Sequence, residues 1–188
     1  QYYKSIQNKV LGIKPVATGC DIRDGVLSSE DVRALSKQNP PSTFLINPWK
    51  YHLPVSPHLA DFKVSAQDIV EFSYQKSFST LDVLLIETAG GLMAPINDTE
   101  TWIDFLTLSR LPVIFVVGMR LGCLNHAMLT EQVLRSHGIH CAGWVANCIQ
   151  PDMLKREENI HTLHSRLKSP WLTTVSYQGT IDTLNKSV

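Results

Sequence analysis

The chain has 188 residues, its 17 basic side chains balance 17 acidic ones, and 44% of its residues are hydrophobic. This size and composition fit one globular domain with a sizeable core, without the basic stripe that binds nucleic acid. No apolar run is long enough to span a membrane, so we expect a soluble, cytoplasmic protein that works without nucleic acid or membrane.

Two features of composition bear on processing and metal binding. The four cysteines lack C-x-x-C spacing, which argues against zinc or a secreted disulfide framework and favours structural thiols. His161 and His164 lack the acidic partners of a metal site. The chain begins at Gln1 rather than at methionine, so we expect an upstream segment that was processed off or lies outside these residues; no signal-peptide pattern indicates export.

Predicted strands alternate with stretches long enough for helices. Apolar, β-branched runs predict strands at 10–17, 81–87, 112–118 and 142–147. Capping residues and helical spacing predict helices at 29–38, 65–77, after Asp98-Thr99, at 124–137 and at 153–167, followed by a less regular tail. This alternation is typical of an α/β fold with a mostly parallel sheet flanked by helices. No repeat or linker divides the chain, so residues 1–188 are predicted to form a single domain.

A lysine follows the first predicted strand, and a hydroxyl comes four residues later. Lys14 and Thr18 lie in Gly-Ile-Lys-Pro-Val-Ala-Thr-Gly. An ammonium at a strand end suits a phosphate or carbamate oxyanion, although a surface lysine fits the pattern equally well. Asp31 lies in the first turn of the helix at 29–38, where the helix dipole alone explains a carboxylate.

The strand at 81–87 delivers a carboxylate into a glycine turn. Its uncharged residues predict a strand covered on both faces, and Glu87 follows them immediately before Thr88-Ala89-Gly90-Gly91. The carboxyl ends of such strands are where α/β sheets bind ligands. Because a charge is costly beside a buried strand, we interpret Glu87 as functional rather than structural.

Two further segments indicate a binding site. Residues 47–58 contain three prolines and predict an ordered, extended loop that shapes a site. Residues 116–126 read as a strand, a glycine turn and a helix start, which gathers backbone amides into an anion site. His126, in the new helix, is interpreted as a packing or capping residue.

Taken together, these segments resemble the dethiobiotin synthetase family over about residues 12–165. The matching pieces, in order, are Lys-Pro-Val-Ala-Thr-Gly at 14–19, Ser-Glu-Asp at 29–31, Asn-Pro and Pro-Val-Ser-Pro-His within 47–58, Glu-Thr-Ala-Gly-Gly at 87–91, the run at 111–127, and Gly-Trp-Val-Ala-Asn at 143–147. Several short motifs in the right order are more specific than any one of them.

The resemblance implies a homodimeric, P-loop NTPase-like ligase of biotin biosynthesis. Such an enzyme carboxylates 7,8-diaminononanoate with bicarbonate or CO₂ and closes a cyclic urea, using ATP and Mg²⁺. Lys14 falls on the family's catalytic lysine. Asp31 and Glu87 fall on its Mg²⁺-binding carboxylates, which reverses the interpretation of Asp31 from its helix position alone.

The resemblance also implies two sets of binding residues. The substrate would be bound by Thr18, Gly122, Cys123, Leu124 and Asn125, the last four across the dimer interface. The nucleotide would be bound by Asp31, Glu87, Thr88, Ala89, Gly90, Asn147, Cys148, Ser176, Tyr177 and Gln178. Within this set, Asn147 would read the adenine.

The sequence departs from the family pattern in four places. No G-x-x-x-x-G-K-[ST] motif occurs in these residues, so we expect the N-terminal strand and phosphate loop to lie upstream of Gln1. The stretch 59–62 is shorter than the family's connection. Thr88 replaces a glycine, and residues 173–176 replace a tail segment near the nucleobase, which leaves nucleotide preference open.

Two alternatives remain beside the intact ligase. One is a non-catalytic nucleotide- or metabolite-binding relative that lacks the phosphate loop. The other is an amide-forming P-loop ligase that acts on a larger acid, and the loop at 47–58 and the helix start at 122–125 argue against it.

Overall fold

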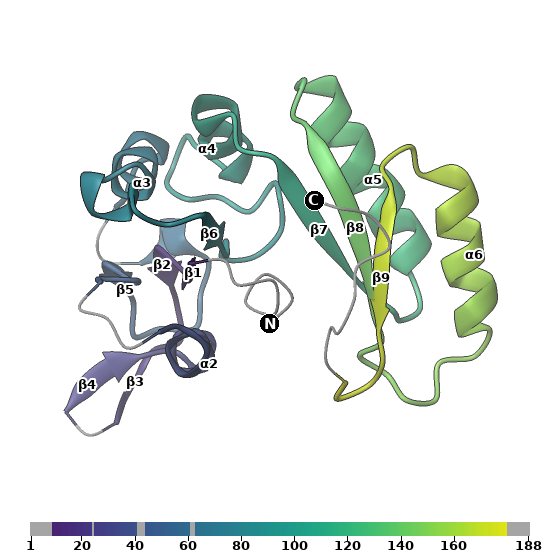
Figure 1. Cartoon of the computed structure of the whole chain (residues 1–188), viewed down its shortest axis with the longest axis horizontal. Helices are drawn as coiled ribbons and strands as arrows, with labels where there is room; N and C mark the ends of the chain where they lie inside the picture. The colour runs from purple at the N-terminus through teal and green to yellow at the C-terminus, as the bar shows by residue number, and fades with distance from the viewer. Residues whose placement is uncertain (1–8, 24, 41–43, 61–62, 180–188) are drawn as a thin grey trace. The chain divides into compact units, whose positions relative to one another are not determined.

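The computed structural model describes residues 9–23, 25–40, 44–60 and 63–179. It divides into two compact units, which meet along the sequence between Ser109 and Arg110, and each is treated separately below. Both units contain parallel strands and helices, as Figure 1 shows, so the α/β class predicted from the sequence is confirmed. The single-domain organisation stays a prediction. Among the described residues, none of the helices has the length and apolar character needed to cross a membrane.

The first unit is built around short parallel strand pairs. β1 (Val10–Ile13) pairs with β6 (Val83–Ile86), with Val10 opposite Val83 and Ile13 opposite Ile86. β2 (Val16–Ala17) pairs in parallel with β5 (Trp49–Lys50). β3 (Asp21–Arg23) and β4 (Val26–Ser28) form an antiparallel hairpin.

Helices of the first unit begin where the sequence supplies capping side chains. α2 (Glu30–Gln38) is capped by Ser29, whose hydroxyl accepts from the Val32 amide. α3 (Ala66–Ser73) begins with a capping box between Ser65 and Asp68. The unit also contains α4 (Trp102–Ser109) and the 3₁₀ turns η1 (Pro57–Leu59) and η2 (Lys76–Phe78). Leu11, Ile13 and Phe78 form one of its buried clusters.

A side chain pairs with β1 as a neighbouring strand would. The Gly12 amide donates to Asn39 Oδ1 at 2.8 Å, and Asn39 Nδ2 donates to the Gly12 carbonyl at 2.8 Å. The helix approaches β1 closely at this point, since a Cβ at position 12 would lie 2.8 Å from Leu35 Cδ2 on α2 and displace that side chain. The two hydrogen bonds of Asn39 hold the end of α2 against β1.

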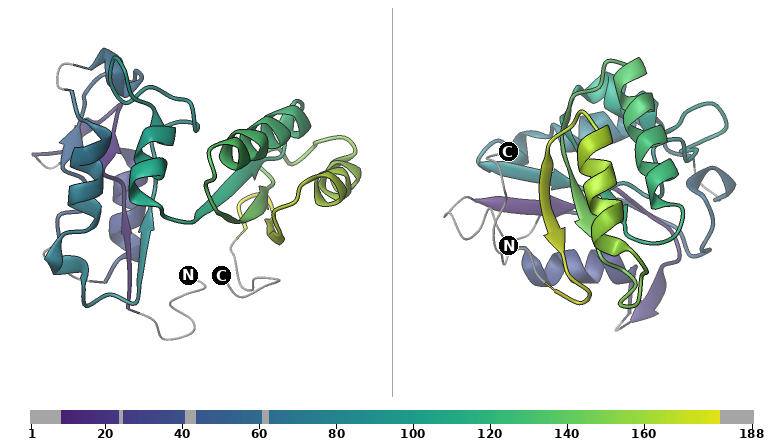
Figure 2. Two further views of the ribbon diagram at one scale, coloured as in Figure 1. Left: turned by 90° about the horizontal axis from the view of Figure 1, so that it is seen from above. Right: turned by 90° about the vertical axis from the view of Figure 1, so that its right-hand side faces the viewer.

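The second unit is a three-stranded parallel sheet with two helices. Its strands β7 (Val113–Gly118), β8 (Cys141–Asn147) and β9 (Trp171–Val175) lie in that order. Figure 2 shows α5 (Cys123–Ser136) and α6 (Arg156–Arg166) on one face of this sheet. Trp144, Leu134 and Leu163 are completely buried in the unit.

Four details differ from the sequence-based expectations. The strand predicted at 10–17 is divided into β1 and β2, which pair with different strands on either side of Lys14 and Pro15. β6 is only partly buried and Leu85 is 43% exposed, so the expectation of a strand covered on both faces is wrong. The predicted helix at 65–77 ends at Ser73, because the chain turns into η2. The tail expected to be irregular contains β9. This strand is stabilised by its pairing with β8 and has no clear strand pattern in its sequence. The shortened stretch 59–62 falls partly outside the described residues.

Candidate active site

Lys14 follows β1 at a point where the surrounding backbone is firmly held. Its amide donates to the Ile46 carbonyl at 3.0 Å, and its carbonyl accepts from Asn47 Nδ2 at 2.7 Å. Asn47 is 1% exposed and also contacts the Pro15 carbonyl at 3.2 Å. The loop that begins at Asn47 was predicted to shape a site, and its first residue anchors the lysine backbone.

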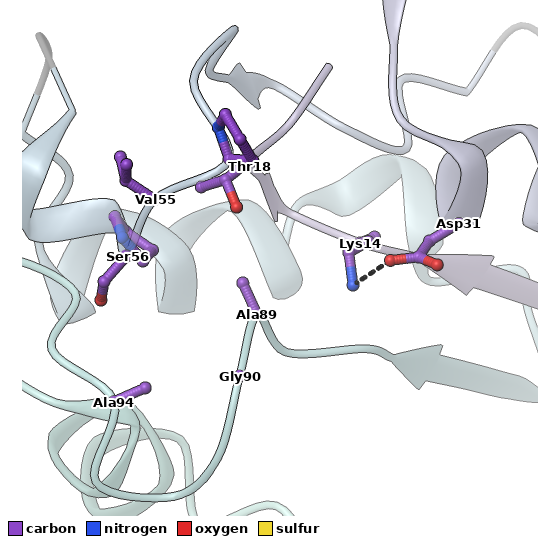
Figure 3. Close-up of a pocket in the computed structure, with 10 residues that line it drawn as sticks. Lys14, Thr18, Asp31, Val55, Ser56, Ala89, Gly90 and Ala94 are labelled. Carbon is purple, nitrogen blue, oxygen red and sulfur yellow. Dashed lines mark ion pairs between the residues drawn. The ribbon is translucent and has the colours of Figure 1, made fainter. Parts of the chain in front are cut away.

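The ammonium of Lys14 lies between two carboxylates. Lys14 is only 6% exposed, and its Nζ is 2.6 Å from Glu87 Oε1 and 3.1 Å from Asp31 Oδ2. Figure 3 shows the pair with Asp31. A third contact joins Nζ to the Thr88 carbonyl at 3.2 Å. A buried ammonium requires such partners, whereas both carboxylates keep about half of their surface in contact with solvent.

Register places Glu87 beside Lys14. The Glu87 amide donates to the Ile13 carbonyl at 2.8 Å, which continues the β1–β6 pairing by one step. The side chains that follow these two parallel strands therefore emerge at the same edge. Asp31 reaches this edge from the first turn of α2. The three charged residues come from three separate segments, and the fold gathers them at the carboxyl ends of β1 and β6.

The turn after Glu87 depends on glycine and on a tryptophan. Gly90 has a φ of +84°, and a Cβ there would lie 3.1 Å from the Ala94 Cβ. The Ala94 amide donates to the Gly91 carbonyl at 2.8 Å, which closes the turn. The indole of Trp102 donates from Nε1 to the Ala89 carbonyl at 2.7 Å. The turn is thus held by its own backbone and by the first residue of α4.

A cavity of about 360 Å³ opens beside these residues. Such a volume suits part of a small-molecule ligand. In Figure 3, Lys14 and Asp31 lie on one side, with Thr18, Ser56 and Ala89 around the space. Its wall is formed by Lys14, Thr18, Asp31, residues 54–57, Ala89, Gly90 and Ala94. The structure therefore brings Thr18, Asp31, Ala89 and Gly90 to one cavity with Lys14, and Glu87 and Thr88 contact that lysine.

The carboxylates of Asp31 and Glu87 fit a divalent cation of a particular kind. Within the described part of the chain, no group of three or more His, Cys, Asp or Glu residues could enclose a metal. Mg²⁺ does not require such a cage, because it is usually held by one or two carboxylates together with waters and substrate phosphates. Two half-exposed carboxylates beside a cavity supply this donor set.

In the second unit, the candidate nucleotide residues share one sheet edge. Asn147 is the last residue of β8 and lies opposite Gly118 and Val175. The Cys148 amide donates to the Val175 carbonyl at 2.8 Å, and burial raises the pKa of the Cys148 thiol. Ser176, Tyr177 and Gln178 follow β9 and are exposed. The carboxyl edge of the sheet thus collects Asn147, Cys148 and the start of the tail.

The candidate substrate residues of the second unit form the start of α5. Gly122 is the N-cap residue and has a φ of +92°. Among the described residues, no side chain caps the first turn of α5. Cys123 is buried, whereas Asn125 is exposed and Leu124 is half-buried. Amides in the first turn of a helix have no partner within that helix, so this start can bind an anion.

Sequence reasoning missed two residues of the first unit. Asn47 was read only as part of the loop at 47–58, although it fixes the Lys14 backbone. Trp102 was read only as an apolar residue of a helix, although it bonds to the turn after Glu87. The Asn-Pro pair was the available signal for Asn47, and nothing in the sequence singles out Trp102.

Comparison with known proteins identifies relatives of this chain. The sequence profile of a family described as AAA domain matches residues 1–184. The ATP-dependent dethiobiotin synthetase BioD of Legionella pneumophila (strain Paris) is 44% identical over 173 residues, covering 90% of this chain and 82% of that protein. The protein of the same name from Cellvibrio japonicus is 40% identical over 171 residues, covering 88% and 75%. That from Nitrosospira multiformis is 35% identical over 176 residues, covering 92% and 77%.

Proposed function

The chain belongs to the family of ATP-dependent dethiobiotin synthetases, ligases of biotin biosynthesis, and we propose that it converts 7,8-diaminononanoate into dethiobiotin with bicarbonate or CO₂ as the carbon source. The observation that carries this proposal is the Lys14 ammonium, set between Asp31 and Glu87 on the wall of a cavity. A fixed cation beside two acids that can hold Mg²⁺ supplies the positive charge that stabilises a phosphoryl group during its transfer.

The proposed reaction has three steps. One amine of the substrate adds to CO₂ and loses a proton, which forms a carbamate. A carbamate oxygen then attacks the γ-phosphorus of ATP, and the bond to the bridging oxygen of ADP breaks. The second amine attacks the carbamate carbon, the carbon–oxygen bond to phosphate breaks, and the ring closes with loss of a proton.

Lys14 supports these steps through its position and charge. Its ammonium is held by Glu87, Asp31 and the Thr88 carbonyl, and its backbone by Asn47 and Ile46, so little reorganisation is needed when charge develops near it. We assign it to the carbamate and transferring phosphoryl oxygens. The hydroxyl of Thr18, on the same cavity, is assigned to the diamine.

Asp31 and Glu87 would hold Mg²⁺ together with the nucleotide. The bound ion would neutralise phosphate charge and bridge the nucleotide to the protein. In this arrangement the two carboxylates of the chain orient the nucleotide phosphates next to Lys14. Thr88, Ala89 and Gly90 would border those phosphates, since Ala89 and Gly90 line the cavity.

We assign the nucleobase and the substrate carboxylate to the second unit. Asn147 would read adenine through its carboxamide, next to Cys148, Ser176, Tyr177 and Gln178 at the same sheet edge. The start of α5, from Gly122 to Asn125, would bind the substrate carboxylate across the interface of a homodimer. Because ATP is the co-substrate, we place the reaction in the cytoplasm.

The proposal is tested by measuring phosphate release from the full-length protein. Release that requires ATP, Mg²⁺, bicarbonate and 7,8-diaminononanoate together, with dethiobiotin identified by mass, is the expected result. Four reactions that each omit one component serve as controls. Release without the diamine would indicate a simple ATPase, and nucleotide binding without any release would indicate a binding protein.

A further inference from the structure

We propose that Trp102 is a positioning residue that sets the affinity for ATP by holding the turn formed by Ala89, Gly90 and Gly91. This inference rests on the proposed function, because it takes this turn to border the nucleotide phosphates. Trp102 is not itself a lining residue of the cavity, but it bonds to the backbone of one that is, Ala89. The indole reaches the turn across 13 positions of sequence.

Trp102 is held firmly enough to position another group. It is 1% exposed, and its ring meets that of Phe105 edge-on with centroids 5.9 Å apart. Asp104 fixes the start of α4 by accepting from the Thr101 amide at 2.7 Å and from the Thr101 hydroxyl at 3.0 Å. The indole N–H is therefore presented from a capped helix and a packed ring.

Two consecutive carbonyls after Glu87 are each held by a side chain. The Thr88 carbonyl accepts from Lys14 Nζ at 3.2 Å, and the next one, that of Ala89, accepts from Trp102 Nε1 at 2.7 Å. Gly90 follows in the left-handed region, which brings the chain around the cavity. The lysine and the tryptophan thus fix neighbouring peptide groups of the same turn.

Fixing the Ala89 carbonyl matters because of its charge. A carbonyl oxygen carries partial negative charge, and it repels a phosphate if it turns toward one. While the indole N–H binds that oxygen, the peptide cannot rotate to present it to the cavity. Without the indole bond, the turn gains conformations that oppose an anionic ligand, so nucleotide binding weakens while the charged residues stay in place.

Burial of Trp102 does not by itself explain why its N–H donates a hydrogen bond. Trp144 is also completely buried, and its Nε1 has no hydrogen-bond partner among the described residues. The protein therefore accommodates a buried indole without using its N–H. Trp144 in the second unit provides a matched control for the same change of side chain.

The test compares Trp102→Phe with Trp144→Phe. Phenylalanine keeps an aromatic ring and removes the N–H, so both variants lose similar packing but only one loses a hydrogen bond. For Trp102→Phe we expect the KM for ATP to rise about tenfold while kcat changes by less than about twofold. For Trp144→Phe we expect both constants to stay within about twofold of the parent. Equal KM values in the two variants, or a loss confined to kcat, would overturn the proposal.

Direct binding separates this inference from the proposed function. Titration calorimetry with ATP and Mg²⁺ measures affinity whether or not the diamine is a substrate. If the parent protein binds ATP but makes no dethiobiotin, the proposed function fails, and weaker binding by Trp102→Phe than by Trp144→Phe still supports the role of Trp102. Unchanged ATP affinity in Trp102→Phe overturns that role even when the parent makes dethiobiotin.

A second variant covers the case in which Trp102→Phe does not fold. A benzothienyl analogue of tryptophan, introduced at position 102 alone, keeps the shape of the indole and replaces its N–H with sulfur. The same rise in the KM for ATP is expected, with an unchanged unfolding temperature. An analogue that binds ATP as the parent does would exclude the hydrogen bond as the cause.

Discussion

The two units assemble their candidate residues by different physical means. In the first unit, Lys14 contacts both Asp31 and Glu87, because a buried ammonium is stable only when charged partners surround it. In the second unit, Asn147 and the α5 start share a sheet edge through backbone geometry. We therefore expect loss of any one charge in the first unit to impair the function of all three residues. Each residue of the second unit should instead affect only its own contribution to binding.

The largest effect is expected from removing the shared cation. Lys14→Ala should lower the rate of dethiobiotin formation by about a thousandfold, because the preorganised charge opposite the developing oxyanion is lost. The fold should persist, since Asp31 and Glu87 are half exposed and can be hydrated. Steady-state rates and thermal unfolding check both points, with Lys63→Ala, which loses a surface ion pair with Asp98 and a hydrogen bond to the His58 carbonyl, as control. An unchanged rate in Lys14→Ala would remove this lysine from catalysis.

A smaller effect should follow from neutralising one acid of the same set. Glu87→Gln keeps the shape of the side chain but removes a hard anionic ligand, so the Mg²⁺ concentration for half-maximal activity should rise about 10- to 100-fold. Titration of activity against Mg²⁺ measures this shift. Glu30→Gln, on the exposed first turn of α2 beside Asp31, is the control. A superimposable titration curve would exclude Glu87 as a ligand and weaken the contrast between the units.

In the second unit, a single change should affect base recognition alone. Asn147→Asp is isosteric but cannot donate hydrogen bonds, so the KM for ATP should rise about tenfold without a change in kcat. Comparing ATP with GTP checks that the loss concerns the base. Asn159→Asp, on α6, controls for the added charge. Equal losses with both nucleotides would show that Asn147 does not read adenine.

The smallest effect concerns stability and its dependence on pH. Glu131, 5% exposed on α5, accepts hydrogen bonds from the Lys168 and Ser169 amides just before β9. Burial raises the pKa of this carboxyl, but hydrogen bonds from Ser169 and Lys168 outweigh it and hold the pKa below the ordinary value of 4.5. The stabilisation should therefore be complete above that value and be lost as the pH falls through the lowered folded-state pKa.

Glu131→Gln tests this stabilisation. The variant should lose about 1 kcal/mol of unfolding free energy at neutral pH and show a weaker acid dependence. Denaturant unfolding between neutral and acidic pH measures both quantities, with exposed Glu157→Gln on α6 as control. Parallel pH curves for the parent and Glu131→Gln would contradict the prediction.

Much of the fold follows from local sequence pattern. The strands β7 and β8 and the helices α2 and α5 agree with their predicted ranges within a few residues, because apolar runs and capping residues mark them. β5 and the β3–β4 hairpin were missed, since two or three residues give no periodicity, and β2 was joined to β1 in one predicted strand. β9 was missed because its order comes from pairing with β8.

Some residues of the candidate site could likewise be predicted from the sequence, and others could not. Glu87 was proposed as functional because a charge at the end of an apolar strand is costly without a role, whereas Lys14 fitted a surface lysine equally well until the family resemblance was considered. Asp31 required the family resemblance, because the helix dipole explains an acid in that position equally well. Asn47 and Trp102 act on the backbone of residues 33 and 13 positions away, and only the folded structure reveals such contacts.

The pairing of Asn39 with Gly12 has a consequence for solubility. A strand with unpaired backbone groups is a template onto which other chains can add and aggregate. At Gly12 the backbone N–H and C=O both bond to the carboxamide of Asn39. Because this partner is a side chain and not a strand, it presents no backbone groups to which another strand could pair. Asn39 thus completes the hydrogen bonding of β1 at this point while preventing growth of the sheet, which protects the strand that leads directly to Lys14.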